Sequence, residues 1–254
     1  MDLKPQSDKS STAYNSKEFI NRVDELKRTH PRSLYPSEAW SLYRILPECK
    51  NVLDLGCGGG DMAEIVNVIS KSTQYIGLDS NQNLIDIAKK SSFRGNPRFI
   101  AEDVFKYLEK KELFECVMGW AFLYAVLDPY KLLELMVKKA SKYVLFDIRS
   151  AAMNEDVLDM SRSHVVYGEN KGPLPIVSFR NFIDAIRGYE EQLEEVEMAS
   201  YYFPFGPHVV IDKNIPEPAV ISVVLKKSST NSKTPKQAVK WHMNLPKEFW
   251  EELS

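Results

Sequence analysis

Apolar and polar positions along this chain of 254 residues first follow a helical rhythm. Residues 16–29 and 36–46 each place apolar side chains on one face of a helix, and Pro31 ends the first of these two predicted helices. Residues 1–15 are polar and rich in serine, so we expect a loose tail there. The N-terminal part therefore predicts two short helices that precede the first strand.

The middle of the chain alternates short strand-like runs with helical ones. The predicted strands are NVLDL, QYIGLD, PRFIAED, LFECVMG and KYVLFD. Between them, apolar side chains recur every three or four residues, as on helices that pack against a sheet. Strands separated by helices of this length form βαβ units. The pattern predicts a parallel sheet with helices on both faces.

This alternation stops after Arg149. Residues 149–177 contain two glycines and two prolines without a clear period, and we interpret them as an insertion. The next predicted helix is SFRNFIDAIRGY, with Ser178 as its N-cap. Two further strands, LEEVEMASYY and AVISVVLKK, are joined by a long loop of aromatic residues and prolines.

The C-terminal part begins with a polar stretch. Residues 226–240 hold five lysines and no acid, which predicts a basic linker. NLPKEFWEEL then predicts a short helix whose apolar side carries Phe249, Trp250 and Leu253. This helix could dock on the domain or join two copies of the chain, and we favour docking.

Composition changes this picture little. The net charge of −2 gives no general reason to expect nucleic acid or an anionic membrane as partner. No run of about 18 apolar residues predicts a membrane span, and the N-terminus lacks the apolar core of a signal peptide. The three cysteines are too few and scattered for a disulfide framework or a metal site, and they favour a reducing compartment. We expect a soluble cytoplasmic protein without a metal, either monomer or homodimer.

Candidate chemistry centres on DLGCGGGD at residues 54–61. In the dinucleotide-binding pattern G-x-G-x-x-G, the third glycine would fall at Asp61. An acid there suits the helix dipole but repels a ligand with phosphates. The alternative is an acid-x-Gly-x-Gly-x-Gly pattern, which suits a ligand with an amine and a sulfonium. Its residues are Asp54, Gly56, Gly58 and Gly60.

VLDLGCGGG resembles the first motif of the class I S-adenosylmethionine-dependent methyltransferases, and later segments are similar to the motifs that follow it. The likeness covers residues 35–148 by motif and 178–227 by order of elements. It implies an α/β, Rossmann-like three-layer sandwich with a mostly parallel seven-stranded sheet, an antiparallel last strand and helices on both faces. The implied parts are a tail and lid helix (1–34), the methyltransferase domain (35–227, with an insertion at about 149–177), and a linker with a C-terminal helix (228–254).

The resemblance also implies roles for residues at the strand ends. Asp79 would accept both ribose hydroxyls, as an acid also does in dinucleotide sites. Asp103 would accept the adenine amino group, and the amide of Val104 would reach a ring nitrogen. Each acid could instead simply cap a helix. The residues expected to bind S-adenosylmethionine, whose product is S-adenosylhomocysteine (SAH), are Asp54, Gly56, Cys57, Gly58, Gly60, Asp79, Ser80, Asp103, Val104, Gly119 and Trp120.

Gly119 and Trp120 would border the reacting methyl group. We assign no chemical role to the side chain of Cys57. Methyl transfer is an in-line displacement that needs a base only when the acceptor must lose a proton. The candidate bases are His164, His208 and Tyr124, although either histidine could be structural.

Aromatic residues supply the rest of the expected site. Tyr35, Trp40 and Tyr43, on the helices before the first strand, are implied as part of a lid over the cofactor. The candidates for an apolar acceptor pocket are Trp120, Tyr124, Tyr167, Tyr201, Tyr202, Phe203 and Phe205.

These features predict methyl transfer to a small-molecule acceptor. DPY at 128–130 has one proline and follows the fourth strand too late to match the [DNS]PP[YF] motif of enzymes that methylate adenine, cytosine or glutamine. The lysine-rich linker leaves an RNA or protein acceptor open. A nucleotide-binding module without methyl transfer, including an NAD-dependent enzyme, is the other alternative, against which Asp54, Asp61 and Asp103 argue.

Overall fold

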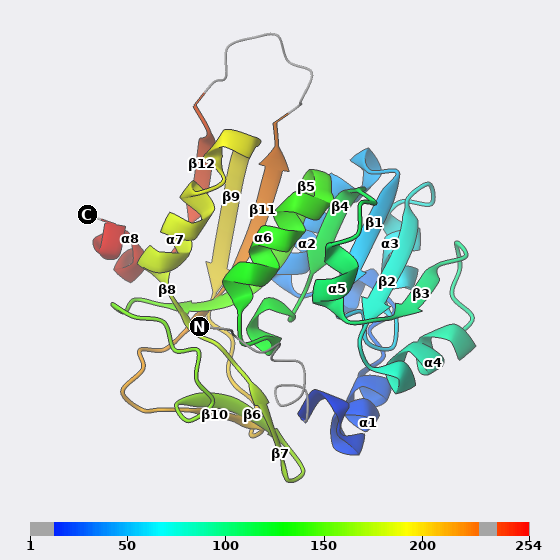
Figure 1. Cartoon of the computed structure of the whole chain (residues 1–254), viewed down its shortest axis with the longest axis horizontal. Coiled ribbons are helices and arrows are strands. Elements are labelled where there is room, and N and C mark those ends of the chain that lie inside the picture. The colour runs from blue at the N-terminus through cyan, green and yellow to red at the C-terminus, as the bar shows by residue number, and fades with distance from the viewer. Residues whose placement is uncertain (1–12, 229–237, 254) are drawn as a thin grey trace.

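The computed structural model describes residues 13–228 and 238–253. A large twisted sheet forms the centre, with helices on both faces (Figure 1). The order of its strands is β12 (Lys240–Asn244), β9 (Leu193–Tyr201), β11 (Ala219–Lys227), β5 (Ala140–Ala151), β4 (Phe114–Gly119), β1 (Asn51–Leu55), β2 (Gln74–Asp79) and β3 (Arg98–Ala101), and β8 (Val177–Ser178) pairs with β5.

Strands β3, β2, β1, β4 and β5 are parallel, whereas β11 runs antiparallel to both β5 and β9. This arrangement confirms the Rossmann-like fold and the antiparallel direction of β11, the last of the seven predicted strands; β8 and β12 add to the predicted seven. Apolar side chains of β1 alternate between the two faces, with Val52 in one buried cluster and Leu53 in the other.

The helices divide between these two clusters. α5, α6 and α7 cover the face seen in front in Figure 1, and α2 and α3 lie behind the sheet. Side-chain caps start several helices: Asn81 Oδ1 accepts from the amide of Asn83 at 3.0 Å, and Ser178 caps α7 as predicted. The bounds are α1 (Lys17–Leu26), α2 (Pro36–Ile45), α3 (Met62–Ile69), α4 (Gln82–Lys90), α5 (Val104–Leu108), α6 (Pro129–Lys139), α7 (Phe179–Arg187) and α8 (Lys247–Leu253).

The stretch expected to be irregular contains a second, smaller sheet. Strands β6 (Ser163–Tyr167) and β7 (Asn170–Pro173) form a hairpin, and β10 (Val209–Ile211) from the aromatic loop pairs with β6. Gly168 has a φ of +61° in the two-residue turn, a conformation that favours glycine. The insertion therefore supplies two strands of a three-stranded sheet, and the aromatic loop supplies the third; this sheet lies with α1 at the lower edge of the large sheet (Figure 1).

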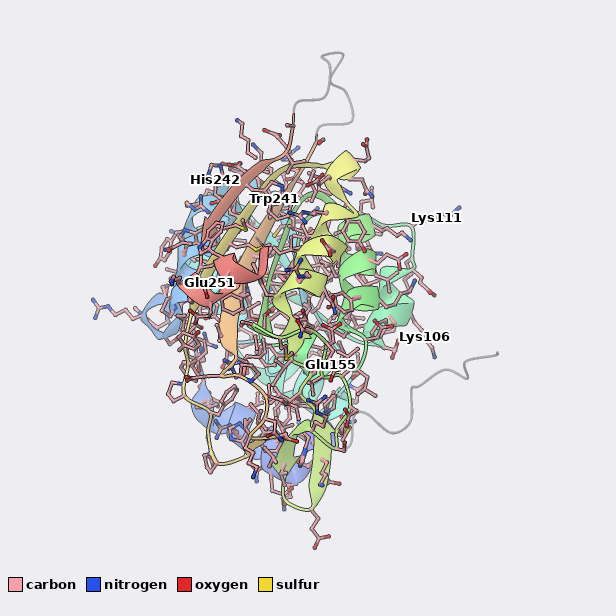
Figure 2. The ribbon with its side chains drawn as sticks, turned by 90° about the vertical axis from the view of Figure 1, so that its left-hand side faces the viewer. Lys106, Lys111, Glu155, Trp241, His242 and Glu251 are labelled. Carbon is pink, nitrogen blue, oxygen red and sulfur yellow. The ribbon has the colours of Figure 1, made fainter. Side chains whose placement is uncertain are left out.

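The C-terminal residues are part of the fold. Strand β12, which the sequence did not predict, pairs in parallel with β9, and Trp241 and His242 lie on it (Figure 2). The ring of Phe249 on α8 is fully buried, 4.8 Å from the ring of Phe179. The C-terminal helix thus docks on the domain, as favoured.

None of the helices in the two described ranges combines the length and apolar character that crossing a bilayer requires.

Candidate active site

The sequence-predicted residues gather at the carboxyl ends of the parallel strands. Asp54 lies near the end of β1 and the glycine turn follows this strand, Asp79 ends β2, and Gly119 ends β4. β1 and β4 are neighbours, with Asp54 opposite Met118, and the chain leaves them toward helices on opposite faces. Ligands of open α/β sheets bind in the crevice that such a switch point creates.

The glycine turn is held close to β2. The amides of Gly56 and Cys57 both donate to the carbonyl of Leu78, at 2.8 and 3.1 Å. Gly56, Gly58 and Gly60 all have positive φ, and a Cβ at Gly60 would lie 2.6 Å from the ring of Phe99. Burial raises the pKa of the Cys57 thiol, so this side chain is a poor nucleophile.

Asp79 connects this turn to the start of α4. Its Oδ2 accepts from the amide of Gly58 at 3.0 Å, and its Oδ1 accepts from the amide of Asn81 at 2.8 Å. Burial raises the pKa of Asp79, and the amides of Asn81, Gly58 and Ser80 oppose that rise. A carboxylate oxygen has two lone pairs, so each oxygen can still accept a ligand hydroxyl.

Asp103 caps α5, as the alternative interpretation held. Its Oδ1 accepts from the amide of Lys106 at 3.0 Å, whereas Oδ2 has no partner among the described residues. Val104 is the first residue of the helix, where amides lack an intrahelical acceptor. One carboxylate oxygen and one amide therefore stay available at the end of β3.

Buried acids surround the crevice. Burial raises the pKa of Asp54 to about 7, the hydroxyl of Tyr75 opposes the rise by donating to Oδ2 at 2.5 Å, and the charges of Glu38 and Asp79 add to it. Burial also raises the pKa of Glu38, against its ion pair with Arg28. Carboxyl groups that share a buried site disfavour each other's ionisation, and a bound cation would reduce the repulsion between their negative charges.

The peptide after β4 is held by another buried acid. Ala121 has a φ of +55°, which is strained for a residue with a Cβ, and its amide donates to Asp147 Oδ1 at 2.6 Å. Burial raises the pKa of Asp147 to about 7, opposed by the Ala121 amide. Beside it, Trp120 Nε1 is buried without a partner in the part of the chain that the structure describes.

Arg149 follows two residues later on β5, on the same face of the strand as Asp147. Its guanidinium carbon lies 4.8 Å from the ring centre of Phe205, 5.3 Å from that of Tyr124 and 5.9 Å from that of Phe203. Asp147 and Arg149 are not among the site residues predicted from the sequence, although Asp147, near the end of the fifth predicted strand, repeats the pattern of Asp54 and Asp79.

A model of the family described as "Methyltransferase domain" matches residues 24–195, more than half of the chain. The chain belongs to this methyltransferase family. Membership confirms the resemblance inferred from the motifs and, with it, S-adenosylmethionine as the cofactor. Among curated protein sequences, none matches the chain significantly.

Solved structures of methyltransferases resemble this one in fold. The N-terminal domain of EvdMO1 with SAH bound has a TM-score of 0.57 and 16% identity, and the match covers 83% of this chain and 96% of that chain. The plantazolicin methyltransferase BpumL in complex with SAH has a TM-score of 0.56 and 13% identity, covering 86% and 93%. A possible histamine N-methyltransferase from Thermotoga maritima has a TM-score of 0.52 and 18% identity, covering 83% and 96%. At such identities the likeness shows the fold alone.

The two histidines proposed as candidate bases lie in and beside the small sheet. His164 is in β6, where burial and the charge of Lys171 lower its pKa. His208 precedes β10 and stacks on Tyr167 with ring centres 5.1 Å apart, and burial lowers its pKa. Within the described residues, no contact joins either histidine to Trp120 or to Asp147.

The expected pocket aromatics separate into groups. Tyr124, Phe203 and Phe205 surround Arg149, and Tyr201 packs near Phe203 at 6.3 Å. Trp120 is buried after β4, and the remaining two lie elsewhere: the ring of Tyr167 packs near those of Tyr14 and Phe19, and the Tyr202 hydroxyl donates to Glu248 on the surface.

The segment over the glycine turn is α1 rather than α2. Val23 of α1 is the nearest side-chain neighbour of a Cβ built on Gly58, at 3.5 Å. The amide of Arg28, just after α1, donates to Asp61 Oδ2 at 2.7 Å. Among the aromatic residues expected in a lid, Tyr43 is 53% exposed, and α2 packs against the large sheet through Leu42.

Proposed function

We propose that this methyltransferase transfers the methyl group of S-adenosylmethionine to a nucleophilic atom of a small-molecule acceptor. The observation that carries the proposal is the group of buried acids at the crevice, above all Asp54, Asp79 and Asp147. An ammonium and a sulfonium would relieve the repulsion among these acids, whereas the phosphates of a dinucleotide would increase it.

The donors and acceptors at the strand ends fit that cofactor. We assign the ribose hydroxyls to Asp79, with Ser80 beside it, and the adenine to Asp103 Oδ2 and the Val104 amide. The backbone at Gly58 permits close approach, since a Cβ there would have only Val23 within 4 Å. Asp54 provides the negative charge for the ammonium and sulfonium ends. When bound, S-adenosylmethionine supplies an electrophilic methyl group.

The protein's contribution to the reaction is alignment of the acceptor with that methyl group. Gly119 and Trp120, at the end of β4, border the reacting position in this proposal. For an acceptor that must lose a proton, Asp147 is our preferred base, because it lies at the Trp120–Ala121 peptide and its pKa is about 7. Tyr124 stays a candidate, since both Asp147 and Arg149 influence its pKa.

Two observations support a small acceptor. The rings of Tyr124, Phe203 and Phe205 gather around the Arg149 guanidinium and suit contact with a small, flat molecule. Two methyltransferases of similar fold are named for plantazolicin and, as a possible substrate, histamine. A cytoplasmic location and a monomeric or dimeric state stay predictions; the free thiols of Cys49 and Cys116, both buried, support a reducing compartment.

Calorimetry with the full chain tests the proposal. S-adenosylmethionine and SAH should bind in the micromolar range or tighter, and NAD should not bind at a hundred times that concentration. Tritium transfer from labelled S-adenosylmethionine to a panel of small molecules would then identify the acceptor. Binding of NAD without binding of SAH would refute the proposal.

A further inference from the structure

Arg149 is a buried cation without a carboxylate partner. Its side chain is 8% exposed, and Nε and Nη1 are both buried with no hydrogen-bond acceptor in the described ranges. A guanidinium carries five N–H donors, and leaving buried donors unfilled is costly. Folds usually pair such a group, so this one can receive an acceptor that the described residues do not supply.

The surroundings of Arg149 fit a ligand site. Rings of Tyr124, Phe203 and Phe205 lie within 6 Å of the guanidinium carbon and stabilise its charge. Rings cannot accept in-plane N–H hydrogen bonds as a carboxylate does, so the Nε and Nη1 donors of the guanidinium have no acceptor among the described residues. Asp147, the acid two residues away, makes no ion pair with it among the described residues and binds the Ala121 amide instead.

Arg149 also lies beside the expected place of methyl transfer. Asp147 and Arg149 are on one face of β5, and Asp147 contacts the peptide that follows Trp120. Phe203 and Phe205 come from the loop after β9, where Phe203 is 37% exposed. The guanidinium therefore lies near the expected methyl-transfer position and contacts rings of a loop that is partly exposed to solvent.

We propose that Arg149 binds the carboxylate of the acceptor, and that the acceptor is a small aromatic or similarly flat monocarboxylic acid. This inference rests on the proposed methyltransferase function. The acid would form two parallel N–H···O bonds with the guanidinium while its apolar part packs on Tyr124, Phe203 and Phe205. A phosphate would carry a second negative charge into a crevice that Asp54, Asp79 and Asp147 already make acidic, so a carboxylate is favoured.

The experiment uses the full chain saturated with SAH and matched pairs of probes. The pairs are benzoate, phenylacetate and 3-phenylpropionate, each with its uncharged amide, and phenyl phosphate is added for comparison. Ligand-observed NMR titration should give at least one acid that binds tenfold or more tightly than its amide. Arg149→Gln should abolish that preference, and Arg149→Lys should keep part of it.

Arg44→Gln is the matched control, because Arg44 also stacks on a ring, that of Trp40 at 4.9 Å, but is paired with Glu197. It should leave the preference unchanged. Equal binding of all acids and amides to the wild-type protein would overturn the inference, as would a preference for phenyl phosphate. A tenfold loss of SAH affinity in Arg149→Gln would also overturn it, because Arg149 would then serve the cofactor.

SAH binding by the wild-type protein separates the two proposals. Its absence refutes the methyltransferase function itself, whereas its presence without acid preference refutes only the role of Arg149. If Arg149→Gln does not fold, as circular dichroism would show, Arg149→Lys and the wild-type acid and amide pairs still decide the question.

Discussion

The amide of Ala121 lies 2.6 Å from Asp147 Oδ1, so a buried acid of β5 holds the strained peptide that follows β4. Because Trp120 immediately precedes that peptide, the position of the indole depends on this hydrogen bond. The same carboxyl group has a pKa of about 7, which makes the contact sensitive to pH.

The free energy of unfolding should therefore fall as pH rises, because the buried Asp147 carboxyl group loses its proton. Its folded pKa of about 7 is above the ordinary 3.8, so its contribution is fully present below pH 3.8 and is lost as pH approaches 7. Asp147→Asn keeps an acceptor for the Ala121 amide and removes the titration. In urea unfolding, the stability of this variant relative to wild type should rise from pH 5.5 to pH 8. Asp147→Ala, which leaves the amide unpaired, should be about 1–3 kcal/mol less stable than Asp147→Asn at both pH values. Equal pH profiles for wild type and Asp147→Asn would contradict this account.

The acids at the crevice should make cofactor discrimination depend on pH. S-adenosylmethionine carries a sulfonium that SAH lacks, and Asp54 and Asp147 gain charge as pH rises through about 7. The ratio of S-adenosylmethionine to SAH affinity should increase several-fold from pH 6 to pH 8 in calorimetry. Asp54→Asn should weaken this dependence. A ratio that stays constant would show that these charges do not reach the sulfur.

Asp79 should contribute most of the affinity for the ribose. Asp79→Ala removes the acceptor proposed for two hydroxyls and frees the Gly58 amide, so SAH binding should weaken at least tenfold, or about 1.4 kcal/mol. Asp86→Ala, on the exposed side of α4, is the control and should bind normally. Unchanged affinity in folded Asp79→Ala would exclude the ribose role.

The glycine turn allows a comparison of adjacent positions. Gly58 has a φ of +54°, so Gly58→Ala should cost about 1–2 kcal/mol through backbone strain alone. Gly60→Ala adds a clash with Phe99 and should cost more. Gly59 is outside the positive-φ region, and its nearest Cβ neighbour lies 3.7 Å away, so Gly59→Ala should change stability by less than about 0.5 kcal/mol. Thermal unfolding that ranks Gly59→Ala as worst would contradict this geometry.

Docking of α8 can be measured in the same way. Phe249 is fully buried against Phe179, so Phe249→Ala should lower the free energy of unfolding by about 3–5 kcal/mol. Trp250 is 43% exposed, and Trp250→Ala should cost less than half as much. Similar losses for the two variants would mean that the helix packs differently.

The strand ends of the large sheet were predictable because each combines an apolar run with a following acid or glycine. Asp54, Asp79 and Asp103 all lie where the motifs put them, and the structure adds that Asp103 also caps α5. The positions of these strand ends can be predicted from local sequence, because hydrophobic periodicity and helix capping each involve only a few neighbouring residues.

The acceptor side could not be predicted in the same way. Arg149 meets Phe205 across more than fifty residues of chain, and no local pattern shows such a contact. Strand β12 has alternating exposure on a sheet edge after a polar stretch, so its five residues resemble a loop in composition. The β6–β7 hairpin did offer one signal, the Gly168–Glu169 pair directly after the apolar run of β6.

Strand β12 has a consequence for any shortened form of the protein. A chain cut after residue 228 would leave the backbone groups of β9 unpaired along one side, and an open strand of that kind recruits strands from other molecules. The C-terminal segment thus covers the edge of β9, and its removal should make the enzyme prone to aggregate and precipitate.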